Sequence, residues 1–123
     1  MIGFNLEFTC LLELLKDGDV LAEDYFGTGL AWGLTRGVER AYLYDINSDL
    51  LTPDISILLD GERFSSGIEM GHRNEAVEQS MWERNREIHR QLAMEFGWEV
   101  AESVFGSPEK THENVMRAIR ERW

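Results

Sequence analysis

The fold interpretation starts from residues 19–33, which read DVLAEDYFGTGLAWG. A short apolar run at residues 20–22 ends in the carboxylates of Glu23 and Asp24, and two glycines then lead into a second apolar segment. Short apolar runs of this kind are typical of buried parallel strands, and open α/β sheets bind ligands at the carboxyl ends of such strands. We therefore predict a strand over residues 19–24 whose carboxyl end faces a ligand. The alternative is a strand, a polar turn and a helix without a ligand.

The rest of the chain alternates between helical and strand patterns. Apolar spacing predicts helices at residues 5–17, 28–35, 38–51 and 74–96, and a last helix that opens at Ser107-Pro108. Strands are predicted at residues 55–59 and 98–103, and residues 61–73 are predicted to form a glycine-containing loop. Gly97 is expected to end the long helix, and Pro108 suits the first position of the last one.

This order of elements predicts an α/β fold with about three parallel strands joined by crossover helices. A chain of 123 residues suits one domain, residues 1–123. Three strands are fewer than the roughly five or six of a typical sheet. The chain therefore reads as if an amino-terminal strand and its helix were absent.

The composition narrows the range of partners. The formal net charge is -11, from 23 acidic and 12 basic residues, which opposes binding to nucleic acid or to an anionic membrane. No stretch approaches the about 18 apolar residues of a membrane span, and the start lacks the basic region of a signal peptide. Cys10, the only cysteine, lies in an apolar run, so we expect a small core residue, no internal disulfide and a cytoplasmic protein.

Four segments carry a family resemblance when they are taken in order. They are LKDGDVL at residues 15–21, EDY at 23–25, TGLAW at 28–32 and TPDISILLD at 52–60. The long helix, Trp98 and a final helix with His112-Glu113 follow. Together they resemble the carboxyl-terminal part of thymidylate kinase, a nucleoside monophosphate kinase with the P-loop fold, from about Leu11 to the end of the chain.

The resemblance implies a partial P-loop-kinase fold of three layers and a set of nucleotide-facing residues. The residues it assigns to binding of a nucleoside monophosphate, thymidine monophosphate in this family, are Glu23, Asp24, Tyr25, Thr28, Gly29 and Trp32. It also implies catalytic lid arginines, Arg63 and Arg73, whose planar guanidinium groups suit the charge on a transferring phosphoryl group. The alternatives are a solvated loop for the two arginines and core positions for Tyr25 and Trp32.

Three departures from the family pattern limit what the chain is expected to do. No Gly-rich loop ending in Lys-Ser/Thr occurs in the sequence, so the ATP and Mg²⁺ that the family uses have no evident binding loop. Asp24 stands where the family has an arginine, and a carboxylate there repels a phosphate. Gly33 stands where many relatives place a base-contacting glutamine.

His72, His89 and His112 lie on separate elements, so no metal site is predicted.

Two hypotheses remain open. The chain is either the nucleoside monophosphate and lid part of a phosphotransferase, inactive alone and completed by a missing amino-terminal segment or a partner chain, or a catalytically dead kinase-like binding or scaffold protein that forms a homodimer. In a monomer we expect residues 19–24 and 55–59 to pair and to give a three-stranded sheet in the order 1-2-3, because unpaired buried backbone groups cost about 1–3 kcal/mol each.

Overall fold

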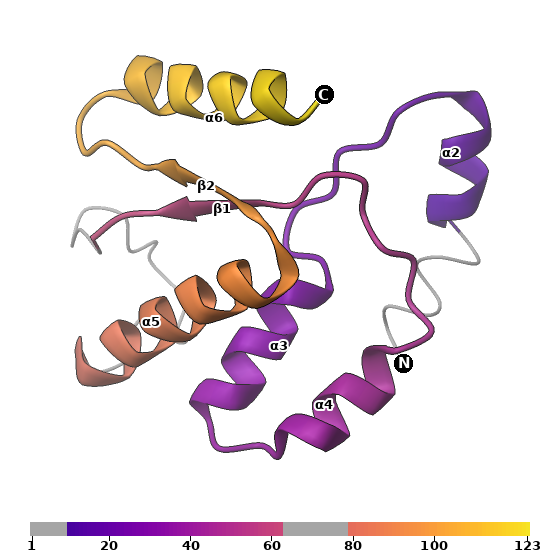
Figure 1. Ribbon diagram of the computed structural model, residues 1–123, viewed down its shortest axis with the longest axis vertical. Coiled ribbons are helices and arrows are strands. Elements are labelled where there is room, and N and C mark those ends of the chain that lie inside the picture. The colour runs from indigo at the N-terminus through magenta and orange to yellow at the C-terminus, as the bar shows by residue number, and fades with distance from the viewer. Residues whose placement is uncertain (1–9, 63–78) are drawn as a thin grey trace. The chain divides into compact units, whose positions relative to one another are not determined.

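The computed structural model describes residues 10–62 and 79–123. It is a mostly helical α/β structure with a small two-stranded parallel sheet packed against helices (Figure 1). The chain divides into two compact units, which we call the amino-terminal unit (Met1–Pro53) and the carboxyl-terminal unit (Asp54–Trp123). The interpretation of residues 1–123 as one domain stays a prediction.

A pair of helices forms the centre of the amino-terminal unit. Helix α3 (Phe26–Thr35) begins two residues earlier than predicted, and α4 (Arg40–Asn47) packs against it after a short turn. The turn passes through Gly37 at φ 86°, a left-handed conformation that glycine adopts without strain. Leu30 and Ala31 of α3 and Leu43 of α4 are buried, so this pair supplies the apolar core of the unit.

Helix α4 is shorter than the predicted span of residues 38–51. Its last turn is closed by side chains that compete for backbone carbonyls. Asn47 Nδ2 donates to the Leu43 carbonyl oxygen at 2.7 Å, and Ser48 Oγ donates to that of Asp45 at 2.7 Å. Short polar side chains of this kind favour helix ends, so α4 stops well before Pro53.

The first described helix, α2 (Leu12–Asp17), lies within the predicted helix at residues 5–17, of which residues 5–9 lie outside the described part. None of its residues is buried. Cys10, just before it, is exposed, so the prediction that this cysteine is a core residue was wrong. An apolar run buries a cysteine only where another element covers the same face, and here Leu14 beside it in the helix stays 51% exposed.

The carboxyl-terminal unit is a β-α-β-α arrangement. Strands β1 (Ile57–Asp60) and β2 (Glu99–Glu102) are parallel and pair from Ile57↔Glu99 to Asp60↔Glu102. Helix α5 (Gln79–Phe96) contacts β1, and helix α6 (Pro108–Arg122) contacts β2 and β1. The predicted strands at 55–59 and 98–103 and their parallel direction are thereby confirmed.

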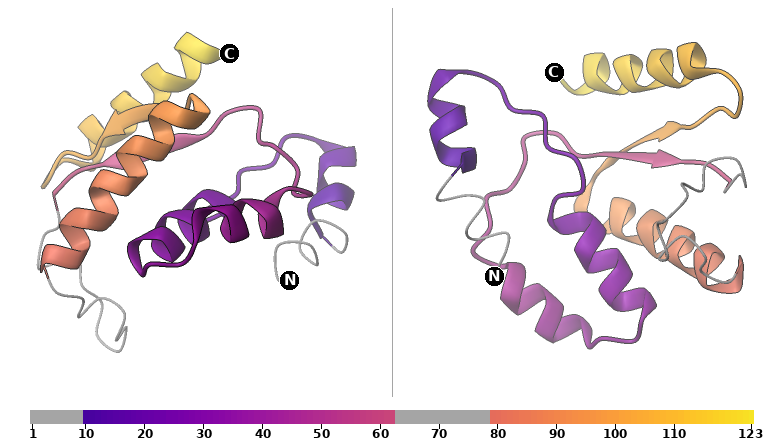
Figure 2. Two further views of the ribbon diagram at one scale, coloured as in Figure 1. Left: turned by 60° about the horizontal axis from the view of Figure 1, so that its bottom comes forward. Right: turned by 180° about the vertical axis from the view of Figure 1, so that it is seen from behind.

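The two helices cover opposite faces of this small sheet, as Figures 1 and 2 show from three directions. Arginines of α5 bind Asp60, whereas Arg122 of α6 lies 3.7 Å from Glu99. Asp60 and Glu99 occupy register positions of opposite parity, and side chains alternate between faces along a strand. The ion pairs therefore place one helix on each side.

The helix ends in this unit follow the sequence signals. Helix α5 ends at Phe96, and Gly97 follows at φ 70° as predicted. Ser107 caps α6 by accepting from the Lys110 backbone N–H at 3.3 Å, and Pro108 is the first helical residue. Of the predicted helix at residues 74–96, residues 74–78 lie outside the described part.

The predicted strand at residues 19–24 was wrong. These residues have no strand conformation, Leu21 is 100% exposed, and Asp24 has φ 52°, which interrupts an extended chain. A strand needs a neighbour for its backbone groups, and in the described part of the chain β1 pairs with β2 alone. Within the described residues the sheet has two strands rather than three, so the predicted order 1-2-3 was wrong as well.

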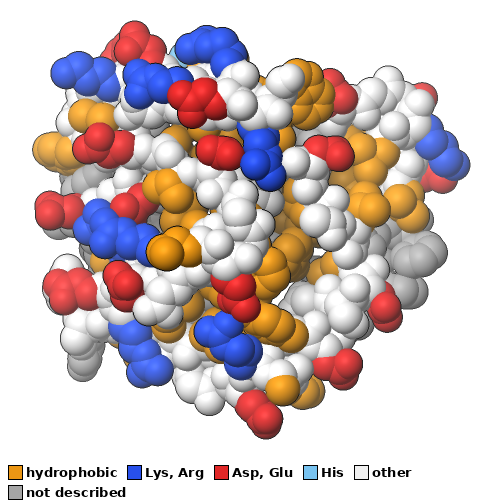
Figure 3. Space-filling model, in the orientation of Figure 1, with side chains coloured by type: hydrophobic (Ala, Val, Ile, Leu, Met, Phe, Trp, Pro, Cys, Tyr) orange, Lys and Arg blue, Asp and Glu red, His pale blue; other side chains and the backbone are white. Residues whose placement is uncertain are grey.

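None of the described helices is both long and apolar enough to cross a membrane. On the face drawn in Figure 3, acidic and basic side chains are interspersed with apolar ones.

Candidate functional site

The residues assigned to nucleoside monophosphate binding lie around the start of α3. Glu23 and Asp24 are exposed and precede the helix, and Tyr25 is its amino-terminal flanking residue in an extended conformation. Thr28, Gly29 and Trp32 lie in the first two turns. The structure therefore brings these residues together on one segment, although that segment is a loop and a helix rather than a strand end.

Asp24, Thr28 and Trp32 are spaced four residues apart along the chain. Residues four apart lie on the same side of a helix, which places Thr28 and Trp32 on one side of α3 with Asp24 just before it. Thr28 Oγ1 donates to Asp24 Oδ1 at 3.3 Å, which joins the hydroxyl to the carboxylate. The local sequence thus presents two oxygen groups and an indole ring in one row.

Trp32 is half-buried, and its ring lies under a guanidinium group. The Arg36 Cζ atom is 5.3 Å from the ring centroid, within the range of a cation–π interaction. The Tyr25 ring packs edge-on against the Phe26 ring at 5.4 Å between centroids. Both aromatic residues of the predicted set therefore combine packing within the unit with partial exposure.

Gly33 explains one departure from the family pattern. A Cβ atom at this position would lie 2.8 Å from both δ carbons of Leu43. A side chain at position 33, such as the glutamine of many relatives, would therefore require the buried Leu43 side chain to shift. The glycine at this position suits the packing of Leu43 against α3.

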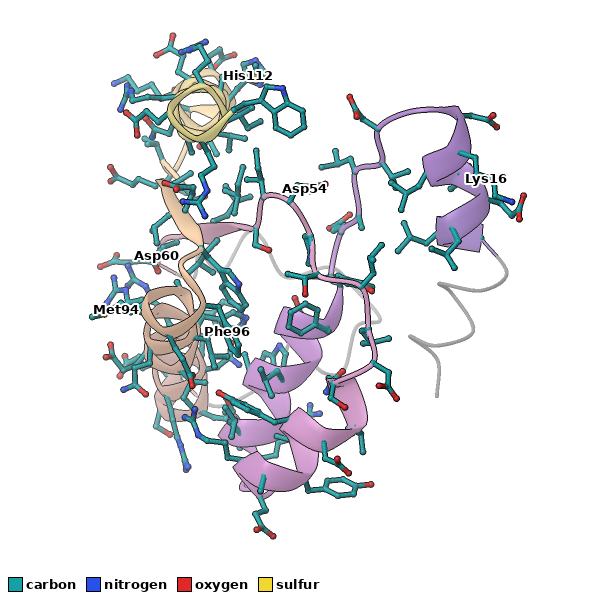
Figure 4. The ribbon with its side chains drawn as sticks, turned by 45° about the vertical axis from the view of Figure 1, so that its right-hand side comes forward. Lys16, Asp54, Asp60, Met94, Phe96 and His112 are labelled. Carbon is teal, nitrogen blue, oxygen red and sulfur yellow. The ribbon has the colours of Figure 1, made fainter. Side chains whose placement is uncertain are left out.

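A second cluster, which the sequence analysis missed, lies at the carboxyl end of β1 (Figure 4). Arg86 Nε donates to Asp60 Oδ1 at 2.9 Å, with Arg86 Nη2 at 3.5 Å from Oδ2. Arg90 donates to Oδ2 of the same carboxylate from Nε at 2.9 Å, and its Nη2 lies 2.8 Å from that oxygen. We call Asp60, Arg86 and Arg90 the Asp60 cluster.

Electrostatics stabilise the charged form of this carboxylate. Burial by itself would raise the pKa of Asp60, but the hydrogen bonds and charges of Arg86 and Arg90 outweigh it and hold the pKa below its ordinary value. The hydrogen bond to Asp60 in turn raises the pKa of Arg86, against a smaller opposing effect of burial. Although the Asp60 side chain is only 15% exposed, its lowered pKa keeps it charged at neutral pH.

The strand ends beside the Asp60 cluster are tightly packed. The Ser103 backbone N–H donates to the Asp60 carbonyl oxygen at 2.8 Å, which continues the parallel ladder past the last strand residues. A Cβ atom on Gly61 would lie 3.0 Å from both Cβ and the carbonyl oxygen of Ser103. Glycine at position 61 therefore lets the segments that follow β1 and β2 leave the sheet side by side.

The sequence places Asp60 directly after the strand predicted at residues 55–59, and Arg86 and Arg90 four residues apart in the helix predicted at residues 74–96. Residues four apart lie on the same side of a helix, but this spacing alone does not show which carboxylate they meet. Only the packing of α5 on β1 shows that both arginines reach the same carboxylate.

The remaining predicted positions give no site within the described residues. Arg63, Arg73 and His72 lie outside the described part of the chain. His89 Nδ1 contacts the Asn85 carbonyl oxygen at 2.9 Å within α5, and His112 is exposed on α6. In the two described ranges no group of three or more histidine, cysteine or acidic side chains could hold a metal ion.

No protein-family model matches the chain, and neither the curated proteins nor the solved structures contain a significant match.

Proposed function

We propose that this chain is the nucleoside monophosphate-binding, carboxyl-terminal part of a thymidylate-kinase-like protein, with thymidine monophosphate as its ligand. The observation that carries the proposal is the row of Asp24, Thr28 and Trp32, spaced by four residues at the start of α3 and joined by the 3.3 Å contact between Thr28 and Asp24. This row coincides with the EDY and TGLAW segments that carry the family resemblance.

The chemistry of the row suits the nucleoside rather than the phosphate. A hydroxyl and a carboxylate can hydrogen-bond a base edge or a sugar hydroxyl, and an indole can stack on a pyrimidine. Asp24 repels a phosphate, since two negative charges at short range oppose each other. We therefore assign base and sugar binding to Asp24, Thr28 and Trp32, with Glu23, Tyr25 and Gly29 shaping the same segment.

The ATP side of the family reaction has no counterpart in this sequence. Phosphoryl transfer depends on positioning and on neutralising the phosphates, which the Gly-rich loop, its lysine and the metal supply in P-loop enzymes. The sequence contains no such loop, and the described residues include no group of three or more histidine, cysteine or acidic side chains that could hold a metal ion. We therefore derive no catalytic step for this chain.

Calorimetric titration of the full chain tests the proposal. Thymidine monophosphate is expected to bind saturably, and ATP is expected not to compete with it for the α3 segment. Thr28→Val removes the hydroxyl at nearly constant volume and is expected to weaken thymidine monophosphate binding about three- to tenfold, the value of one hydrogen bond. The matched control is Thr52→Val, at an exposed position. Absence of saturable monophosphate binding, or equal effects of the two variants, would contradict the proposal.

The second candidate function is a catalytically dead kinase-like binding or scaffold protein, which the missing phosphate loop favours. The coding DNA upstream of the first codon distinguishes the two candidate functions. An in-frame Gly-rich loop supports a partial phosphotransferase, whereas a close stop codon and a promoter support the scaffold protein.

A further inference from the structure

The Asp60 cluster joins two guanidinium groups to one carboxylate. Arg86 uses Nε and Nη2, and Arg90 also uses Nε and Nη2, toward the two oxygens of Asp60. A guanidinium has five N–H donors, so each arginine keeps donors beyond those directed at Asp60. The cluster therefore has more donor capacity and more positive charge than its carboxylate uses.

The surrounding charges offset this excess only partly. Glu87 Oε2 lies 3.9 Å from Arg90 Nη1, but that side chain is 59% exposed. Glu62 is exposed and acts on Arg86 only through its charge. Water screens exposed carboxylates strongly, so Asp60, at 15% exposure, is the one well-shielded negative charge beside Arg86 and the more exposed Arg90.

The two arginines differ in their freedom to accept another partner. Arg86 has 28% of its side chain exposed, and Arg90 has 44% exposed. Arg86 bonds both carboxylate oxygens, whereas Nε and Nη2 of Arg90 both contact one oxygen, Oδ2. Arg90 can therefore turn toward a ligand while Arg86 keeps Asp60 paired.

We propose that the Asp60 cluster is a binding site for a phosphate group, with Arg90 as its main ligand-binding residue and Asp60 as the internal counterion that holds both guanidinium groups in place. A phosphate carries about -1.5 to -2 charges and three acceptor oxygens, so it competes for Arg90 better than a second carboxylate would. The site lies at the carboxyl end of a parallel strand, where α/β sheets bind ligands.

This site belongs to the carboxyl-terminal unit alone and does not depend on nucleoside monophosphate binding near α3. The phosphate comes either from free inorganic phosphate or pyrophosphate, or from a nucleotide. Both sources share the chemistry that two guanidinium groups recognise.

The test is a titration of the full chain with inorganic pyrophosphate, and separately with ADP and adenosine, at constant ionic strength. Binding is followed by calorimetry and by the NMR signals of the arginine Nε–H groups. Arg90→Gln leaves the Arg86–Asp60 pair intact and is expected to weaken pyrophosphate binding about tenfold, the value of a charge-assisted hydrogen bond. Arg84→Gln removes an exposed arginine of the same helix and is the matched control.

A second variant tests the role of the counterion. Asp60→Asn removes the competing charge and is expected to strengthen pyrophosphate binding several-fold in the folded protein, because Arg86 and Arg90 are then both free to pair with the ligand. Shifts of the Arg90 Nε–H signal and a selective loss in Arg90→Gln support the site, and tighter binding of ADP than of pyrophosphate identifies the nucleotide source. Lack of saturable pyrophosphate binding, or equal weakening of that binding by Arg84→Gln and Arg90→Gln, would overturn the proposed phosphate site.

Discussion

At the scale of single residues, Asp60 connects the sheet to a helix distant in sequence. Its side chain accepts hydrogen bonds from residues 26 and 30 positions later, and its carbonyl oxygen accepts from Ser103. Bonds between ionised groups are about twice as strong as neutral ones. Because Arg90 is 44% exposed, its share is reduced by solvent screening, so most of the stabilisation comes from the pair with Arg86.

Asp60→Asn is expected to lower the free energy of unfolding by about 1–3 kcal/mol at neutral pH, because it leaves two arginines without their anionic partner. The folded-state pKa of Asp60 lies below its unfolded value of about 3.9. The contribution of Asp60 is therefore complete above that unfolded pKa and is lost as the pH falls through the lower folded pKa. Denaturant titrations between neutral and acid pH measure both effects.

The control for this prediction is Asp54→Asn, at an exposed position just before β1. It is expected to change the unfolding free energy little at any pH. If Asp60→Asn matched this control at neutral pH and kept the acid-dependent loss of the wild type, the stabilising role of the Asp60 cluster would be refuted.

At the scale of secondary-structure elements, contact between α3 and α4 depends on one glycine. A Cβ atom on Gly33 would lie 2.8 Å from the δ carbons of the buried Leu43 side chain. Glycine inside a helix costs about 1 kcal/mol relative to alanine. The close packing of the two helices offsets that cost. A Cβ atom on Gly29, in the same helix, would meet no other atom within 4 Å.

Gly33→Ala and Gly29→Ala are expected to change stability in opposite directions. Gly33→Ala overpacks the helix pair and is expected to destabilise the protein by about 1–3 kcal/mol. Gly29→Ala adds a methyl group in open space and is expected to stabilise it by about 0.5–1 kcal/mol through helix propensity. Thermal or denaturant unfolding of the two variants checks the prediction. Equal signs for both would show that the α3–α4 contact does not control stability at Gly33.

At the scale of the whole molecule, the chain combines a parallel β-α-β-α unit with a helical unit. The carboxyl ends of β1 and β2 meet at one edge of the sheet, and the Asp60 cluster lies there. The full sequence adds no Gly-rich phosphate loop to that edge. The proposed phosphate and monophosphate sites are therefore binding sites without transfer machinery.

We expect the purified chain to lack kinase activity with ATP and thymidine monophosphate. Positioning of the transferring group supplies about 7–11 kcal/mol of a typical barrier reduction, and the loop that positions the ATP phosphates is absent from the sequence. Release of ADP, coupled to a spectroscopic assay, is expected not to exceed a protein-free blank. Turnover that follows the protein concentration through purification would contradict this expectation.

Local signals in the sequence determined most of the elements. Gly97 and Pro108 marked helix boundaries because glycine tolerates positive φ and proline lacks a backbone donor, and both act within a few residues. The parallel pairing of the strands near residues 57 and 99 followed from the long helix between them. Asp24, Thr28 and Trp32 were assigned to ligand binding through the family resemblance, but Asp24 was placed on a strand, so their row at the start of α3 was not predicted.

Tertiary structure decided what local patterns could not. Residues 19–24 have the apolar run of a strand, but a strand exists only beside a partner, and β1 pairs with β2. Cys10 lies in an apolar segment, yet burial depends on another element covering it. The Asp60 cluster formed because α5 packs on β1 and brings Arg86 and Arg90 to one carboxylate. Pairing, burial and convergence of charges depend on distant residues, so they are properties of the folded chain.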